Sequence, residues 1–288
     1  MMSVNPAFQR LALLAGADTV TRLSGIRVAV FGAGGVGSWC AEALARSAVG
    51  HITLVDSDAV CVTNINRQVE ATAATVGEIK VDALARRLRD INPALGVRPV
   101  GRVFTGARAA EFGIETMDYV IDAIDSLGPK LDLIEYTTRA GVTLYSSMGM
   151  AQKLDAGRIK TAGIWQTEGC PLARLVRQGL RKRGFTGDFT AVYSAERLKR
   201  AEDVEVSCGS ERCFCPARNR ADPDAPVEWC SSKKTINGSA VTVTATAGML
   251  LAGLVLRDVY RRVSAGEKTD TVCAGAPRGE AAAVSRHG

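Results

Sequence analysis

The distribution of apolar residues predicts a β-α-β unit near the start of the chain. Residues 28–31 form an uninterrupted apolar run, which is typical of a parallel strand covered on both faces. Apolar residues at positions 39, 40, 43 and 44 then follow helical spacing. A second, mostly apolar run at residues 51–56 ends in Asp56. The pattern therefore indicates a strand, a helix and a second strand in immediate succession.

The rest of the chain alternates in the same way. We expect a helical arm at residues 5–23, a helix at 80–92, a strand at 97–103, a short helix at 106–113, a strand at 117–122, a helix at 131–140, a strand at 142–146, a hairpin at 152–164 that turns at 155–157, a helix at 171–183, and a last strand and helix within 238–263. This order predicts an α/β fold with a Rossmann-like, mostly parallel twisted sheet and helices on both faces, plus a smaller C-terminal region that faces the substrate. The expected divisions are a helical arm at 1–24, a nucleotide-binding domain at 25–165, a substrate-facing region with a cysteine-rich loop and a final strand and helix at 166–263, and a disordered tail at 264–288.

Composition and charge change this interpretation little. A formal net charge of +6 fits an anionic macromolecular partner, and it also fits simple solubility. The first ten residues lack a signal-peptide pattern, so we expect a cytoplasmic protein with reduced thiols. The uncharged stretch 240–256 is shorter than a membrane span and contains three threonines, so we expect no stable membrane insertion.

A glycine-rich loop follows the first predicted strand. Gly32, Gly34, Gly35 and Gly37 satisfy the pattern G-x-G-x-x-G with one additional glycine. Without side chains, this backbone can turn tightly and approach a phosphate at the N-terminus of the next helix. Asp56, at the end of the second strand, is placed to bind ribose hydroxyls. Together these residues predict a nucleotide site.

Two cations and two acids follow at the same predicted edge of the sheet. Arg67 and Lys80 come after the strand that ends in Asp56, where they are placed to bind phosphates. The alternatives are an ordinary loop arginine and an exposed first residue of a helix. Asp122 and Asp125 follow the strand at 117–122, and an acid there suits magnesium that is also held by substrate phosphates. The alternative role for Asp125 is a helix N-cap.

The second half of the chain contains a basic helix. The helix at 171–183 carries apolar residues on one face and five basic residues on the other, at positions 174, 177, 181, 182 and 183. Such a face suits an RNA backbone, and it equally suits plain solvation.

A cysteine-rich segment follows the basic helix. Cys208, Cys213, Cys215 and Cys230 have the spacing C-x4-C-x-C-x14-C, which matches no common zinc pattern. Three interpretations stay open: a zinc or iron–sulfur site, a reactive cysteine that carries sulfur, or incidental thiols.

These motifs together carry a family resemblance. The carriers are the glycine loop, Asp56-x-Asp58, Thr63-Asn64-x-Asn66-Arg67-Gln68, Lys80 and Asp122-x-x-Asp125. In this order and spacing the chain resembles the adenylating enzymes of the ubiquitin-activating type, the family that contains the activators of the ThiS and MoaD sulfur carriers.

The resemblance implies a role for each motif residue. The glycines would line the phosphates of ATP, Asp56 would bind the ribose, and Asn64, Arg67 and Lys80 would contact phosphates and groups near the base. Asp125 would hold Mg²⁺, and Asp58, Gln68 and Asp122 would belong to the nucleotide-binding set. Arg10 matches an arginine that reaches into the ATP site of a second subunit, which implies a homodimer.

Within this family the chain is most similar to the branch that acts on threonylcarbamoyladenosine in tRNA. That likeness rests on SWCAEALARSAVGHITLVDSD, VCVTNINRQ, YVIDAIDSLGPK, Cys170-Pro171-Leu172 and VTVTATAG. It implies an enzyme that adenylates the threonyl carboxylate and drives its dehydration to a cyclic form, with tRNA as substrate and a sulfur-trafficking protein, SufE-like or a cysteine desulfurase, as an open partner.

Two other functions remain alternatives. One is activation of a ThiS-like or MoaD-like carrier, although the C-x-x-C pairs usual in those activators do not occur here. The other is an NAD-dependent oxidoreductase, which would leave Arg67, Lys80 and Asp125 without a task.

Overall fold

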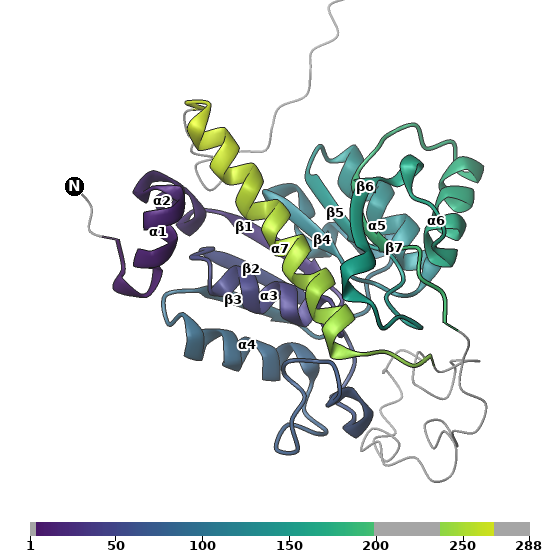
Figure 1. Ribbon diagram of the computed structural model, residues 1–288, viewed down its shortest axis with the longest axis horizontal. Helices are drawn as coiled ribbons and strands as arrows, with labels where there is room; N and C mark the ends of the chain where they lie inside the picture. Colours follow the sequence, from purple (N-terminus) through teal and green to yellow (C-terminus); the bar gives the residue numbers. More distant parts are fainter. Residues whose placement is uncertain (1–3, 199–236, 268–288) are drawn as a thin grey trace, which may run out of the picture.

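The protein is built on one twisted sheet. A computed structural model describes residues 4–198 and 237–267, and these residues form a seven-stranded sheet in the order β3-β2-β1-β4-β5-β7-β6 (Figure 1). The strands are β1 (Arg27–Phe31), β2 (His51–Val55), β3 (Gly96–Val100), β4 (Tyr119–Asp122), β5 (Thr143–Ser147), β6 (Ile159–Gly163) and β7 (Thr190–Ser194). All neighbours pair in parallel except β6 and β7, which pair antiparallel. The predicted Rossmann-like fold is confirmed.

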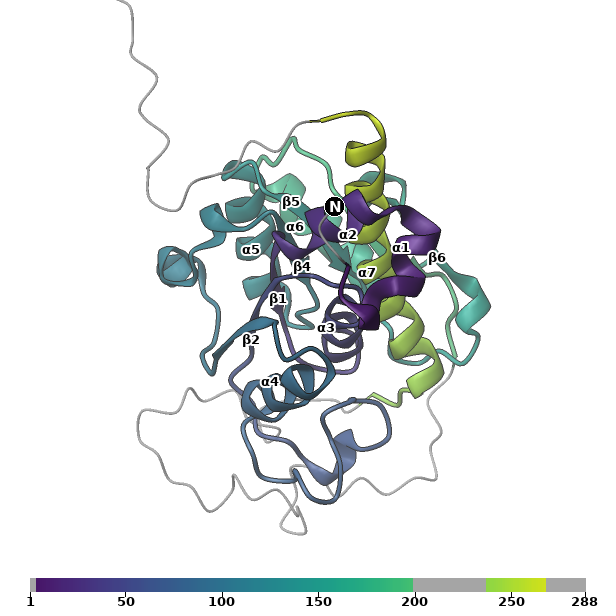
Figure 2. The same cartoon turned by 90° about the vertical axis from the view of Figure 1, so that its left-hand side faces the viewer.

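Helices cover both faces of the sheet (Figures 1 and 2). They are α1 (Gln9–Ala15), α2 (Ala17–Ser24), α3 (Gly37–Ala45), α4 (Lys80–Ile91), α5 (Leu127–Arg139), α6 (Pro171–Lys182) and α7 (Val241–Ser264), with 3-10 turns at Pro6–Phe8, Val62–Asn64, Gly106–Phe112, Ile114–Thr116, Ala156–Arg158 and Ile164–Gln166. Side chains alternate across β1: Val28 and Val30 pack with α2, α3, α4 and α7, while Ala29 and Phe31 pack with α5 and α6. The uninterrupted apolar run therefore contributes side chains to two separate hydrophobic cores, one on each face of the sheet.

The predicted final strand is wrong. Residues 241–264 form a single helix, α7, whose Val243, Ala247, Leu251 and Val255 are fully buried. These four positions recur every four residues, which is the spacing of one helical face, and the gain from burying that face outweighs the strand preference of the β-branched start.

The predicted hairpin at 152–164 is also wrong. Only Ile159–Gly163 is a strand, and it pairs with β7, which the sequence pattern did not reveal. Asp155 instead accepts a hydrogen bond from the Gly157 N–H (2.9 Å) and starts a 3-10 turn. The expected helical arm at 5–23 is divided into a 3-10 turn and the helices α1 and α2, which separate at Gly16 (φ +88°), and the expected short helix at 106–113 is a 3-10 turn. The remaining expected helices and strands are confirmed with ends that shift by a few residues.

Helix α7 has the length and apolar composition of a membrane span. This is weak evidence, because the core helix of a soluble protein passes the same test. Here the buried face of α7 packs on α3 and the sheet, and a Cβ atom added to Gly248 would lie 2.5 Å from the Val36 carbonyl oxygen.

One observation bears on the predicted domain boundaries. Strands β6 and β7 extend the same sheet as β1–β5, so a boundary at residue 165 separates strands of one sheet. Cys208, Cys213, Cys215 and Cys230, and most of the predicted tail at 264–288, lie outside the described residues.

Candidate active site

The loops that follow β1, β2 and β4 meet at one edge of the sheet. β1 lies between β2 and β4, so the chain leaves β1 in both directions, and such a switch point is where open α/β sheets bind ligands. Gly32 has φ +92°, and a Cβ atom there would lie 2.7 Å from the Ala123 carbonyl oxygen. At Gly37 a Cβ atom would lie 1.8 Å from the Gly32 carbonyl oxygen. Gly32 and Gly37 are therefore required for the tight turn of the loop.

Asp56 fixes this loop from the end of β2. Its Oδ2 accepts the Ala33 N–H (2.7 Å), and its Oδ1 accepts the Asp58 N–H (2.8 Å). Burial raises the pKa of Asp56, and the nearby charge of Lys80 opposes that shift. These contacts place Asp56 next to the glycine loop, and its binding of ribose stays a prediction.

Lys80 is the first residue of α4 and is only 5% exposed. Its Nζ donates to Asp58 Oδ2 (2.8 Å), and its backbone N–H donates to the Asp58 carbonyl (3.0 Å). Burial alone would lower the pKa of Lys80, but the charges of Asp56 and Asp58 outweigh it and raise the pKa. Lys80 is thus a buried cation at the edge of the sheet where the loops after β1, β2 and β4 meet, which we call the rim. It is not an exposed first residue of a helix.

Arg67 lies against the glycine loop and the start of α7. A Cβ atom added to Gly35 would lie 3.2 Å from Arg67 Cγ and 3.2 Å from Thr244 Cβ. The Trp39 indole N–H donates to the Arg67 carbonyl (3.0 Å), and the Arg67 guanidinium donates to the Thr63 carbonyl (2.9 Å). The structure therefore brings Arg67 to the predicted phosphate loop.

The neighbours of Arg67 are also fixed. Asn66 donates to the Ser239 carbonyl (2.8 Å), which ties the β2–α4 segment to the start of α7. Asn64 is buried and accepts the Cys61 N–H (2.9 Å), which is a local structural contact. Gln68 is 6% exposed, and its Oε1 has no hydrogen-bond partner among the described residues. A buried acceptor without a donor is costly, so Gln68 Oε1 is, within the described part of the chain, an unsatisfied group beside Arg67.

The Asp122 carboxylate is buried and hydrogen-bonded within the protein rather than exposed at the site. It is fully buried, where its Oδ2 accepts hydrogen bonds from Lys130 Nζ and Ser146 Oγ (2.6 Å each). Its Oδ1 accepts the Ile124 N–H (3.1 Å). Both carboxylate oxygens are occupied, so the geometry gives Asp122 a role in shaping the loop after β4, not the direct nucleotide contact that the sequence suggested.

Asp125 lies further along the same loop and is exposed. It accepts a hydrogen bond from Ser126 Oγ (3.4 Å), and Ser126, not Asp125, is the N-cap residue of α5. The alternative role of Asp125 as a helix cap is therefore not supported. Among the residues that the structure covers, no cluster of three or more potential metal ligands occurs.

Arg10 is not brought to this site. It is exposed on α1, which lies beside the C-terminal part of α7, whereas the glycine loop lies by the first turns of that helix (Figures 1 and 2).

The basic face of α6 is partly committed to internal contacts. Arg177 donates to the Thr167 carbonyl (2.8 Å), Arg181 lies 5.3 Å from the centre of the Trp165 ring, and Arg183 pairs with Asp132 (2.7 Å). Arg174 and Lys182 are exposed.

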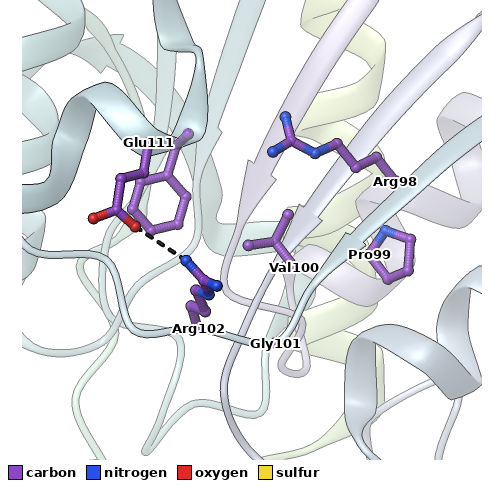
Figure 3. A pocket seen from close by; sticks show the side chains of 7 residues that line it. Arg98, Pro99, Val100, Gly101, Arg102 and Glu111 are labelled. Carbon is purple, nitrogen blue, oxygen red and sulfur yellow. Dashed lines mark hydrogen bonds and ion pairs between the residues drawn. The ribbon is translucent and has the colours of Figure 1, made fainter.

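A pocket of about 330 Å³ opens beside the end of β3 (Figure 3). It is lined by Arg98, Pro99, Val100, Gly101, Arg102, Glu111 and Phe112. Arg102 pairs with Glu111 across it (3.1 Å). The pocket adjoins the Asp56 loop, because the Asp56 N–H donates to the Val100 carbonyl (3.2 Å). None of the predicted site residues lines it.

One residue of the site escaped the sequence analysis. Glu70 is 2% exposed, and its charge interacts with those of Lys80 and Asp56. A single acid in a polar loop has no motif around it, so only its burial in the folded chain reveals it.

The fold and the rim define a class of protein: an α/β nucleotide-binding protein whose glycine loop is flanked by two cations, Arg67 and Lys80. Residues 8–270 match the ThiF family, and the chain belongs to that family. The resemblance to ubiquitin-activating-type adenylating enzymes is thereby confirmed.

Several proteins similar to this chain share one name. The chain is 37% identical to the tRNA threonylcarbamoyladenosine dehydratase of Bacillus subtilis over 257 residues, 89% of this chain and 95% of that protein. It is 34% identical to the Escherichia coli enzyme of the same name over 265 residues, 89% of this chain and 94% of that protein. A crystal structure of that E. coli dehydratase in complex with ATP superposes with a TM-score of 0.74 at 31% identity, and the match covers 92% of this chain and 99% of that one.

A more distant relative matches only part of the chain. The molybdopterin-synthase adenylyltransferase of E. coli is 34% identical over 129 residues, which is 45% of this chain and 51% of that protein.

Proposed function

We propose that this protein is an ATP-dependent enzyme that adenylates the carboxylate of threonylcarbamoyladenosine in tRNA and drives its dehydration to the cyclic form. The observation that carries the proposal is the near full-length similarity to dehydratases of that name, together with a rim that holds Arg67 and Lys80 beside the glycine loop. Cytoplasmic location belongs to the same proposal.

The chemistry follows from the charges at the rim. The threonyl carboxylate attacks the α-phosphate of ATP and displaces pyrophosphate, which leaves an acyl adenylate. Arg67 and Lys80 stabilise the charge that develops on the phosphates. A nucleophile of the same modified side chain then attacks the activated carbonyl and expels AMP, so that the net change is loss of water.

No general base is needed for the first step, because a carboxylate is already ionised at neutral pH. This agrees with a chain whose two histidines are His51, exposed at the start of β2, and His287, outside the described residues. The enzyme then acts mainly by positioning and electrostatics.

Magnesium fits the residues at the rim. Mg²⁺ is commonly held by one or two carboxylates together with substrate phosphates, and the exposed Asp125 supplies one carboxylate two residues after Ala123, which touches the glycine loop. The ion would neutralise phosphate charge there.

A second copy of the chain is proposed to complete the site. Leu13 and Leu14 on α1 are 84% and 82% exposed, and two adjacent exposed leucines favour coverage by another protein surface. A homodimer that covers this helix would carry Arg10 towards the partner subunit's nucleotide.

The tRNA surface is proposed to include α6. Arg174 and Lys182 are exposed there, so both are available for contacts with backbone phosphates.

The alternatives are less favoured. Activation of a sulfur carrier fits the nucleotide site, but the match to an enzyme of that kind covers 45% of this chain. An NAD-dependent oxidoreductase would leave Arg67, Lys80 and Asp125 without a task.

One assay separates the three functions. Pyrophosphate release is measured with ATP and tRNA bearing threonylcarbamoyladenosine, then with a ThiS-like or MoaD-like carrier, and NAD⁺ reduction is followed in parallel. We expect release with the modified tRNA alone. Release that depends on the carrier, or reduction of NAD⁺, would contradict the proposal.

A further inference from the structure

Glu70 is buried in the segment between β2 and α4, and the N–H of its neighbour Val69 donates to Ser38 Oγ on the first turn of α3 (3.3 Å). The Glu70 carbonyl accepts the Thr75 hydroxyl (2.7 Å), which fixes the backbone of the loop at this residue. Its side chain is 2% exposed, and neither carboxyl oxygen has a hydrogen-bond partner of normal geometry among the described residues. An ionised carboxylate in such a place is unfavourable unless a cation compensates it.

The charged and polar groups around Glu70 come from each of the neighbouring elements. From α3 come Ser38 and, through its pair with Arg87, Glu42. From α4 come Lys80 and Arg87, and from the end of β2 comes Asp56. Arg87 is paired with Glu42, since its Nε donates to Glu42 Oε2 (2.5 Å) and its Nη2 to Glu42 Oε1 (3.2 Å). The charge of Glu70 acts on both Arg87 and Lys80, and Lys80 is the cation that pairs with Asp58 beside the Asp56 loop.

Glu70 changes the balance of charge around Lys80. When Glu70 is ionised, the Lys80 ammonium interacts with three carboxylates, those of Asp56, Asp58 and Glu70. When Glu70 is neutral, one of these is removed, and more of the positive field of Lys80 is directed at an incoming phosphate. Burial raises the pKa of Glu70 to about 7, so both forms are present near neutral pH.

We propose that Glu70 is a proton-linked positioning residue of the nucleotide site, which acts through Lys80 and favours the binding of nucleotide phosphates in its neutral form. The inference rests on the proposed function, because it takes a nucleoside triphosphate as the ligand. The family motifs give no role to this position, which lies two residues after Gln68.

The direction of the pH dependence follows from the charges. A polyanion near Glu70 disfavours its ionised form, so binding of the nucleotide raises the pKa of Glu70 further and takes up a proton. Affinity for nucleotide should therefore be highest below pH 7 and fall as the pH rises above it. A coupling of one pKa unit corresponds to a change of about tenfold.

The test is calorimetric titration with MgATP at pH 6.5 and 8.5. For a coupling of one pKa unit, we expect the dissociation constant of the wild-type protein to rise about sixfold between these values, and this rise to be largely lost in Glu70→Gln and Glu70→Leu. Glu78→Gln is the matched control, since Glu78 lies in the same segment but pairs with Arg86 at the surface (2.7 Å). It should keep the wild-type pH dependence.

Proton uptake gives a readout that needs no variant. Titration at pH 7 in two buffers with different ionisation enthalpies should show uptake of about half a proton by the wild-type protein on binding MgATP. Equal pH dependence in wild type and both Glu70 variants, or no proton uptake, would overturn this inference but leave the proposed function standing. A wild-type protein that binds no MgATP at either pH would overturn the proposed function and this inference together.

Discussion

At the scale of single residues, Arg67 is the side chain whose loss separates chemistry from folding. Its backbone carbonyl, not its guanidinium, accepts the Trp39 hydrogen bond, so Arg67→Ala keeps the contact that anchors the loop. We expect pyrophosphate release to fall about 10²- to 10³-fold, the usual effect of removing one charge-stabilising donor. Pyrophosphate release and the circular dichroism melting curve should be measured together. Arg102→Ala, at the pocket beside β3, is the control, and normal turnover by Arg67→Ala would exclude Arg67 as a phosphate ligand.

For Lys130 we predict a loss of stability rather than a loss of activity. It is fully buried and paired with Asp122 (2.6 Å), so Lys130→Met leaves a carboxylate in the interior without its cation. Loss of one partner of a buried pair typically costs about 3–5 kcal/mol. Urea denaturation should show that drop, and the double variant Lys130→Met with Asp122→Asn should recover part of it. A double variant no more stable than the single one would argue against charge as the cause.

At the scale of elements, the packing of α7 on α3 depends on one glycine. A Cβ atom at Gly248 would meet the Val36 carbonyl at 2.5 Å, whereas a Cβ atom at the exposed Gly253 meets nothing within 4 Å. We expect Gly248→Ala to destabilise the protein by about 1–3 kcal/mol, and Gly253→Ala to stabilise it by roughly 0.5–1 kcal/mol. Thermal unfolding of both variants provides the measurement. Equal shifts in the two melting temperatures would mean that the α3–α7 contact is looser than described.

The same elements show what the sequence could and could not predict. The β-α-β unit was predictable, because the glycine loop, the helical spacing after it and the terminal Asp56 are all local signals. The start of α7 was not, since alternating valine and threonine fit a strand until burial against α3 decides for the helix. β7 was missed for a related reason: it is five residues long and is defined by its pairing with β5 and β6.

The residues of the candidate site also fall into those that the sequence could predict and those that it could not. Arg67, Lys80 and Asp56 were predictable from motif spacing alone. The burial of Asp122 against Lys130 and the inward position of Glu70 depend on contacts between distant segments, which spacing does not encode.

At the scale of the whole molecule, the proposed homodimer makes a sharp prediction. If Arg10 acts in the partner subunit's site, Arg10→Ala and Arg67→Ala should each lower activity alone by about 10²-fold or more. Equal co-expression of the two variants yields heterodimers in half of the assemblies, each with one intact site, so about a quarter of wild-type activity should return. Pyrophosphate release by the co-purified mixture is the measurement. A mixture as inactive as its components would contradict a shared site.

The contact of Thr244 with Gly35 has a consequence for synthesis of the protein. The glycine loop, residues 32–37, comes far earlier in the sequence than the helix that packs against it, residues 241–264. A nascent polypeptide still attached to the ribosome can form the β-α-β unit long before α7 has been translated. A nucleotide would thus meet the finished site only after residues 241–264 have been translated.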